Sequence, residues 1–134
     1  MISPEDFFMV EAVYAAGPID AVTTGESRDW QDSLAEALPD ILIFSPAHPY
    51  FNASFKRARH IDRINRWAID VCQCVVAYLP PGRQAFGTIR EIEYSVQAGY
   101  PTIVVGPEVR SFLTYDLVRV NTIQEVSRHL VSSG

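Results

Sequence analysis

The stretch Cys74-Val75-Val76-Ala77-Tyr78-Leu79, followed by Pro80-Pro81-Gly82 and then by Phe86-Gly87-Thr88-Ile89-Arg90-Glu91, decides the fold. Its first six residues form a continuous apolar run, which is typical of a strand buried on both faces. The Pro-Pro-Gly turn ends that run, and a threonine three residues before a glutamate is a common helix start. A buried strand followed closely by a helix is the repeating unit of a parallel α/β sheet.

The rest of the chain repeats this alternation. Apolar runs predict four more strands, at Phe8–Ala16, Ile41–Phe44, Pro101–Val105 and Leu117–Val120. Between them, apolar residues at helical spacing predict helices through Trp30, Leu34 and Leu38, through Ile61, Ile64, Ala68 and Ile69, from Thr88 to about Ala98, and from Thr122 with Val126 and Leu130 inward. Gly99 is the predicted C′ residue that ends the third of these helices. We therefore predict an α/β fold with a doubly wound, five-stranded parallel sheet, flavodoxin- or Rossmann-like, in a single domain spanning residues 1–134.

Charge and composition narrow the class of partner. The 134 residues carry a formal net charge of -5, which argues against a nucleic-acid polymer, and no apolar run reaches the ~20 residues of a membrane span. The acidic start lacks a basic segment before an apolar stretch, so we expect a cytoplasmic protein without membrane contact. Five of the eleven basic residues lie between Lys56 and Arg66, and that cluster forms either a local anion site or a solvated helix face.

The cysteines and histidines do not indicate a metal. Cys72 and Cys74 would lie on one face of a strand as buried, reduced thiols, and the three histidines are far apart in sequence. Neither a Gly-x-Gly-x-x-Gly motif after the first strand nor a Walker motif is present. The sequence thus predicts no metal site and no cofactor.

Three segments are expected to meet at the carboxyl edge of the sheet, where doubly wound folds bind ligands. They are Gly17–Asp20, the long loop after Phe44, and Phe86–Glu91. The aromatics Tyr50 and Phe51 on the long loop are candidates to stack on a ligand. Glu91, expected on the first helical turn, is either a nucleophile or base, or with Thr88 forms a capping box.

In this order the motifs resemble the nucleoside 2-deoxyribosyltransferase family, including its branch of nucleotide N-glycoside hydrolases. Tyr14-Ala15-Ala16-Gly17-Pro18-Ile19-Asp20 resembles the opening Tyr-x-x-Gly motif of that family, and Cys72–Leu79 resembles its third strand. Gly87-Thr88-x-x-Glu91-Ile92-x-Tyr94 and the following Gly99–Val105 resemble its nucleophile helix and next strand. The match covers most of the chain.

The resemblance implies a role for each matched residue. Glu91 would attack the anomeric carbon of a nucleoside or nucleoside monophosphate, forming a covalent glycosyl-enzyme. Gly17 would let the backbone approach the ligand, Tyr14 and Ile19 would line the pocket, and Gly87 and Thr88 would donate to the sugar or its 5′ group. The resemblance also implies a homodimer or higher homo-oligomer.

Two positions depart from the family pattern. Asn65 stands where relatives have an Asp on the helix before the third strand, and Ala85 stands where they have Asp or Ser. The sequence therefore does not identify the residue that protonates the departing base, and Asp62 and Asp20 are the candidates. Two other hypotheses remain: a catalytically silent nucleotide-binding or sensing module, and a cytokinin-type nucleotide phosphoribohydrolase, whose Pro-Gly-Gly-x-Gly-Thr-x-x-Glu motif is echoed in part.

Overall fold

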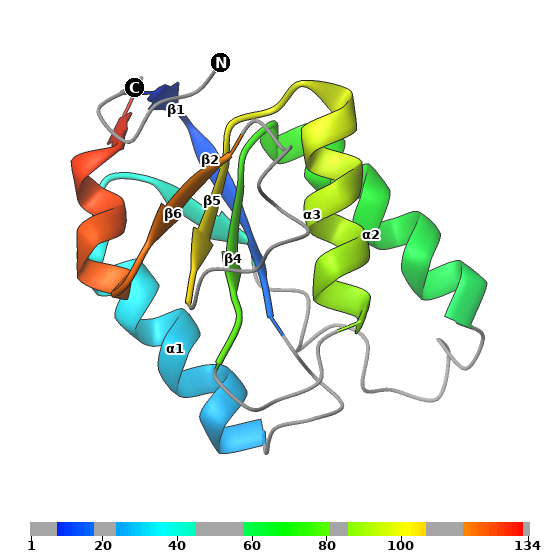
Figure 1. The fold of residues 1–134 in the computed structure, drawn as a ribbon, viewed down its shortest axis with the longest axis horizontal. Coiled ribbons are helices and arrows are strands. Elements are labelled where there is room, and N and C mark those ends of the chain that lie inside the picture. The colour runs from blue at the N-terminus through cyan, green and yellow to red at the C-terminus, as the bar shows by residue number, and fades with distance from the viewer. Residues whose placement is uncertain (1–7, 18–23, 45–57, 81–85, 107–116, 133–134) are drawn as a thin grey trace.

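Five parallel strands form the central sheet of the structure, a computed structural model that describes residues 8–17, 24–44, 58–80, 86–106 and 117–132 (Figure 1). For residues 24–28, 58–62 and 86 it describes the backbone alone. In spatial order the strands are β3 (Leu42–Phe44), β2 (Ala12–Ala16), β4 (Val75–Tyr78), β5 (Thr102–Val105) and β6 (Val118–Val120). The predicted five-stranded parallel sheet is confirmed.

Helices cover both faces of this sheet, as Figure 1 shows. The helix α1 (Thr24–Ala37) and the 3-10 helix η2 (Ile123–Arg128) pack on one face, and α2 (Ala58–Cys72) and α3 (Phe86–Ala98) pack on the other. In the sheet, β3 lies next to β2 on one side and β4 lies next to it on the other. The switch point of strand order therefore lies between β2 and β4. The fold is therefore doubly wound, as predicted.

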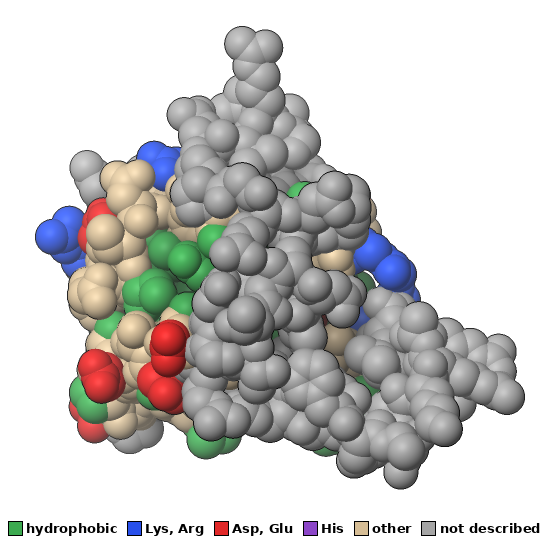
Figure 2. All heavy atoms as spheres, turned by 90° about the horizontal axis from the view of Figure 1, so that it is seen from below, with side chains coloured by type: hydrophobic (Ala, Val, Ile, Leu, Met, Phe, Trp, Pro, Cys, Tyr) green, Lys and Arg blue, Asp and Glu red, His purple; other side chains and the backbone are tan. Residues whose placement is uncertain are grey.

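Strand alternation divides the core into two layers. On β2, Val13 and Ala15 pack toward α1, whereas Tyr14 and Ala16 pack toward α2 and α3. The predicted stripe of α1 is buried, with Trp30, Leu34 and Leu38 all less than 10% exposed. Asp29, Asp32 and Glu36 on this helix face solvent, and Figure 2, which looks onto the carboxyl ends of the strands, shows acidic side chains gathered on the α1 side.

The two ends of the chain depart from the prediction. Phe8–Ala16 is not one strand: it divides at Glu11 into β1 (Phe8–Val10) and β2. β1 pairs in parallel with a last strand, β7 (Leu130–Ser132), which takes the place of the predicted end of a helix. The capping box of Thr122 and Glu125 is present, but the helix that follows it is the short η2. Leu130 is buried as predicted, but it belongs to strand β7 and not to a helix.

Cys72 and Cys74 are free thiols, as expected, but they do not share a strand. Cys72 ends α2, Cys74 precedes β4, and Gln73 between them has a φ of 58°. Burial raises the pKa of the Cys72 thiol to about 11 and that of the Cys74 thiol to about 12, with Cys72 adding to the shift of its neighbour. Both thiols are thus protonated near neutral pH. Within the described ranges, no helix is both long and apolar enough to cross a bilayer.

Two glycines that follow elements have positive φ for different reasons. Gly99 has φ 83° after α3, where it acts as the predicted C′ residue, and a Cβ there would meet no atom within 4 Å. Gly106 has φ 148° after β5, and a Cβ there would lie 2.4 Å from the carbonyl oxygen of Leu79. Only the second position combines backbone strain with a clash against neighbouring backbone.

We expect Gly99→Ala to lower the free energy of unfolding by about 1 kcal/mol, the cost of placing a side chain in the left-handed region. Gly106→Ala should cost roughly 3 kcal/mol or more, because the Leu79 carbonyl must also move. Urea unfolding of both variants measures the difference. Equal losses would contradict the close packing of β4 against the end of β5.

We also expect both cysteines to resist alkylation in the native protein. At pH 8 a thiol of pKa about 11 holds on the order of a hundredfold less reactive thiolate than an ordinary cysteine. Iodoacetamide labelling followed by mass spectrometry should show unmodified native protein, and two labels per chain in urea. Rapid labelling of Cys74 without denaturant would contradict its burial.

Candidate active site

Tyr14 links the sheet to the candidate nucleophile. Its side chain is fully buried on the α2–α3 side of β2, and its ring stacks on Phe44 of β3 with centroids 5.8 Å apart. The Tyr14 hydroxyl donates a hydrogen bond to Oε2 of Glu91 on α3. One carboxylate oxygen of Glu91 is therefore held from the sheet, close to the switch point of strand order.

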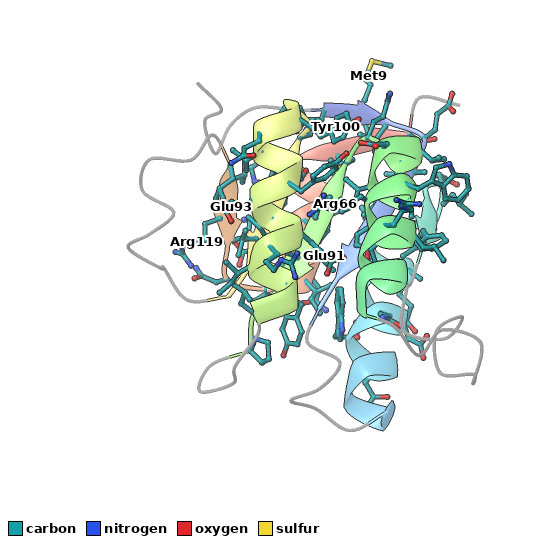
Figure 3. The ribbon with its side chains drawn as sticks, turned by 90° about the vertical axis from the view of Figure 1, so that its right-hand side faces the viewer. Met9, Arg66, Glu91, Glu93, Tyr100 and Arg119 are labelled. Carbon is teal, nitrogen blue, oxygen red and sulfur yellow. The ribbon has the colours of Figure 1, made fainter. Side chains whose placement is uncertain are left out.

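Glu91 lies in the second turn of α3, because that helix begins at Phe86 and its first turn contains no acidic residue. The expectation of a first-turn position was wrong by about one turn. The Glu91 side chain is half-buried, and Figure 3 shows it on the side of α3 that faces α2. It thus lies in the space between two helices rather than at a helix terminus.

Thr88 does not cap α3. It is itself helical and 2% exposed, and its Oγ1 has no hydrogen-bond partner among the described residues, so the alternative of a Thr88–Glu91 capping box is not realised. Residues at i and i+3 lie on the same side of a helix, so Thr88 lies one turn before Glu91 on the same face of α3. Gly87 is exposed, and a Cβ there would meet no atom within 4 Å.

Asn65 brings a second unsatisfied group from α2. Its side chain is half-buried, and its Oδ1 is fully buried with no hydrogen-bond donor among the described residues. An unpaired buried carbonyl oxygen costs about 1–3 kcal/mol, and a ligand that supplies an N–H or O–H would remove that cost. Asp62 lies one turn earlier on the same helix, but its side chain is outside the described part.

A cation–π contact and hydrogen bonds join side chains of α2 to those of α3 and of the segment that follows it. Arg66 on α2 lies over the ring of Tyr94 on α3, with 5.5 Å from its guanidinium carbon to the ring centroid. Asp70, one turn further along α2, accepts hydrogen bonds of 2.9 Å from the hydroxyls of Tyr94 and Tyr100. Donation to this carboxylate, with smaller contributions from desolvation and charge, raises the pKa of both tyrosines. In Figure 3, Arg66 and Tyr100 lie between the helices with Glu91.

This helix clamp, formed by Arg66, Asp70, Tyr94 and Tyr100, was not predicted. Arg66 was predicted only as part of a basic cluster that would form a local anion site or a solvated helix face. The available signal was the spacing of Arg66 and Asp70 at i and i+4, which puts a cation and an anion on one face of α2. Its target on α3 could be seen only once the two helices were placed together.

Gly17 follows the last residue of β2 and faces the opposite side of the sheet from Tyr14. A Cβ at Gly17 would lie 2.6–2.9 Å from three atoms of the Trp30 indole. The alternation of β2 explains this, since Gly17 continues the face of Val13 and Ala15, which points toward α1. In the described part of the structure, Gly17 therefore packs closely against Trp30.

Four predicted site residues lie outside the described residues: Ile19, Asp20, Tyr50 and Phe51. Their roles stay predictions, as does that of the Asp62 side chain. Of the others, Tyr14 and Glu91 are in direct contact, and Thr88 shares a helix face with Glu91. Within the described ranges, no group of three or more His, Cys, Asp or Glu side chains could hold a metal ion. The described groups offer a positioned carboxylate, a hydroxyl and an amide.

Solved structures share this fold, although no protein-family model and no curated protein sequence matches the chain. A 2-deoxyribosyltransferase from Bacillus psychrosaccharolyticus superposes with a TM-score of 0.69 at 15% identity, covering 87% of this chain and 90% of that one. A conserved protein from Enterococcus faecalis V583 gives a TM-score of 0.60 at 17% identity, covering 94% and 92%. A 2-deoxyribosyltransferase from Leishmania mexicana gives 0.57 at 19% identity and covers 71% of this chain, which spans 63% of that one.

These similarities define the class of architecture. The chain has the α/β fold seen in 2-deoxyribosyltransferase structures, with the five-stranded parallel sheet and the helices on both faces along most of its length. At identities below 20% the similarity concerns the fold, and the chemistry has to be argued from the residues of this chain.

A double-mutant cycle measures the Tyr14–Glu91 contact directly. We expect Tyr14→Phe and Glu91→Gln each to change the free energy of unfolding, with a coupling energy of about 1–2 kcal/mol, because the donor meets a carboxylate and the donor side is buried. Urea unfolding at neutral pH of the two single variants and the double variant gives this value. A coupling energy near zero would show that the two side chains do not interact in solution.

Proposed function

We propose that this protein cleaves the N-glycosidic bond of a nucleoside or nucleoside 5′-monophosphate and passes the (deoxy)ribosyl group to water or to another nucleobase. The observation that carries the proposal is the hydrogen bond from Tyr14 to Glu91. It holds a carboxylate beside the switch point of a doubly wound sheet, where such folds bind ligands. Two of the solved structures with the same fold are 2-deoxyribosyltransferases, which supports this reaction class.

Glu91 acts as the nucleophile in this proposal. One of its oxygens attacks the anomeric carbon while the bond to the base breaks, and the electron pair of that bond leaves with the base. A water molecule or an acceptor base then attacks the same carbon, releases Glu91 as a carboxylate and gives net retention. The hydroxyl of Tyr14 holds Oε2, so the carboxylate is oriented before the substrate arrives.

The other described groups suit the sugar and the base. The Thr88 hydroxyl can donate or accept without breaking an existing hydrogen bond, and the open space at Gly87 gives a ligand access to the first turn of α3. Asn65 can accept from, or donate to, a ligand, but its amide cannot supply a proton as a carboxylic acid would. The departing base then takes its proton from Asp62, from Asp20 or from solvent.

Assembly and location belong to the same proposal. We expect a homodimer or larger homo-oligomer acting in the cytoplasm. Trp67 and Val71, one turn apart on α2, are 63% and 61% exposed, and an exposed apolar pair of this kind fits a subunit contact. Size-exclusion chromatography with light scattering measures the assembly.

A catalytically silent nucleotide-binding module is the second candidate. The amide of Asn65, where relatives carry an acid, favours it, because binding needs no proton donor. The cytokinin-type phosphoribohydrolase is less well supported. The two halves of its motif, Pro81-Gly82 and Gly87-Thr88-x-x-Glu91, are separated here by four residues. Tight binding of a nucleotide without release of free base would favour the silent module.

We expect Glu91→Gln to reduce base release by at least about 10³-fold, or roughly 4 kcal/mol of transition-state stabilisation, because the amide is a poor nucleophile. Tyr14→Phe should reduce it about tenfold through loss of orientation. The assay incubates the protein with common nucleosides and their 5′-monophosphates, with and without an acceptor base, and separates products by chromatography.

Glu93→Gln is the matched control. Glu93 is exposed, two residues further along α3, and Figure 3 shows it on the other side of that helix from Glu91. This variant should keep the activity of the parent protein. Full base release by Glu91→Gln would refute the nucleophile assignment, and equal losses in both variants would point to a general effect on α3.

A further inference from the structure

Trp30 stands at the switch point from the α1 side of the sheet. Its indole stacks on Tyr78 at the end of β4, with centroids 5.3 Å apart and planes 29° from parallel. It also lies directly against Gly17 at the end of β2. Ala16 of β2 pairs with Ala77 of β4, and Gly17 and Tyr78 are the next residues along the two strands. The indole therefore spans the ends of β2 and β4, the two strands at the switch point of strand order.

The Trp30 indole N–H has no hydrogen-bond acceptor among the described residues, although the side chain is only 5% exposed. An indole nitrogen can only donate, so nothing but an acceptor can satisfy it. Buried Trp side chains usually find such an acceptor, and leaving the donor unpaired costs about 1–3 kcal/mol. A Phe or Leu at this position would fill the core without that cost.

This N–H lies at the strand ends near the switch point, where doubly wound folds bind ligands, and that position favours a ligand over a packing defect. The Gly17 backbone packs directly against the indole edge that carries the nitrogen, because a Cβ there would lie 2.9 Å from Nε1. On the other face of the same sheet, Tyr14 of β2 holds Glu91. A ligand lying across the ends of β2 and β4 could therefore meet Glu91 from one face and the indole N–H from the other.

We propose that the Trp30 indole N–H binds the nucleobase, donating a hydrogen bond to a carbonyl oxygen or ring nitrogen of the base whose sugar faces Glu91. This inference rests on the proposed function, because it takes the ligand to be a nucleoside. The base is joined to the carbon that Glu91 attacks, so the base must lie beside the carboxylate at the strand ends.

The same contact would assist bond cleavage. When the glycosidic bond breaks, its electron pair goes to the base, and negative charge grows on the ring nitrogens and carbonyl oxygens. A fixed N–H donor in a dry site stabilises such charge more than it stabilises the neutral base. With an amide at Asn65 in place of an acid, a donor at Trp30 supports departure of the base without transferring a proton.

The direct test removes the N–H and keeps the shape of the ring. β-(3-Benzothienyl)alanine placed at position 30 replaces the nitrogen by sulfur, and the same replacement at the exposed Trp67 is the control. Both are made with Glu91→Gln to prevent turnover, and calorimetric titration with nucleosides gives Kd. We expect the change at position 30 to raise Kd about fivefold, the worth of one neutral hydrogen bond, and to leave the unfolding temperature unchanged or higher.

An unchanged Kd would overturn the inference. A lower unfolding temperature of the free protein would also overturn it, because the N–H would then serve an acceptor inside the protein. The control replacement at Trp67 should leave Kd unchanged, because Trp67 is exposed on α2 and is not part of the proposed base contact.

Fluorescence provides a second measurement that leaves Trp30 intact. The chain has two tryptophans, so Trp67→Phe makes Trp30 the sole indole fluorophore. Titration with free nucleobases and with nucleosides should change its emission, whereas 2-deoxyribose alone should not. No change at saturating nucleoside, or an equal change with the sugar alone, would contradict contact with the base.

Failure of the inference and failure of the proposed function have different signatures. If Glu91→Gln abolishes base release while removal of the indole N–H changes neither Kd nor emission, the function stands and the role of Trp30 is wrong. If no nucleoside is ever cleaved but removal of the N–H still weakens nucleoside binding, the Trp30 contact stands and the reaction is wrong.

Discussion

The hydrogen bond between Tyr14 and Glu91 joins residues 77 positions apart and is the contact on which the account of this protein depends. It connects the interior strand β2 to the helix α3 and so fixes which side of α3 faces the sheet edge. Burial of the Tyr14 ring against Phe44 keeps the donor in place, because the ring has no room to turn toward solvent. A carboxylate held in this way is oriented at no further entropic cost when a ligand binds.

The helix clamp supports this arrangement from outside. Asp70 receives two phenolic hydrogen bonds and Arg66 lies over the Tyr94 ring, so α2 and α3 are joined at several points. These groups are near the surface, and each contact contributes little to stability. Their effect is geometric: they set the spacing between the helix that carries Asn65 and the helix that carries Glu91. A ligand bound between the helices, as we propose, would therefore meet groups whose separation is already set.

Much of the fold could be predicted from sequence because its signals are local. Continuous apolar runs marked the five strands of the sheet, and the alternation of strands with helices implied a parallel, doubly wound order. Two identical Thr-x-x-Glu patterns show where local signals fail. Thr122 and Glu125 form a capping box, whereas Thr88 is buried inside α3, which begins two residues earlier. The burial of Thr88 in the folded protein overrides its capping preference, and a short motif does not encode burial.

The remaining differences have the same origin. The split of Phe8–Ala16 into two strands depends on a partner strand at the other end of the chain, and the packing of Gly17 against Trp30 depends on where α1 lies. Tyr14 and Glu91 were both predicted as site residues, and the two side chains are in contact. Trp30 was predicted only as part of an apolar helix stripe. That its N–H lacks an acceptor among the described residues could be seen only once β2, β4 and α1 were placed together.

The most direct test of the central claim is to locate the sugar on the protein. Rapid acid quenching of the protein during reaction with a nucleoside, followed by proteolysis and mass spectrometry, should find one (deoxy)ribosyl group on the peptide from α3, attached at Glu91. The adduct should be absent from Glu91→Gln. A sugar adduct on another residue, or an adduct that persists in Glu91→Gln, would contradict the account.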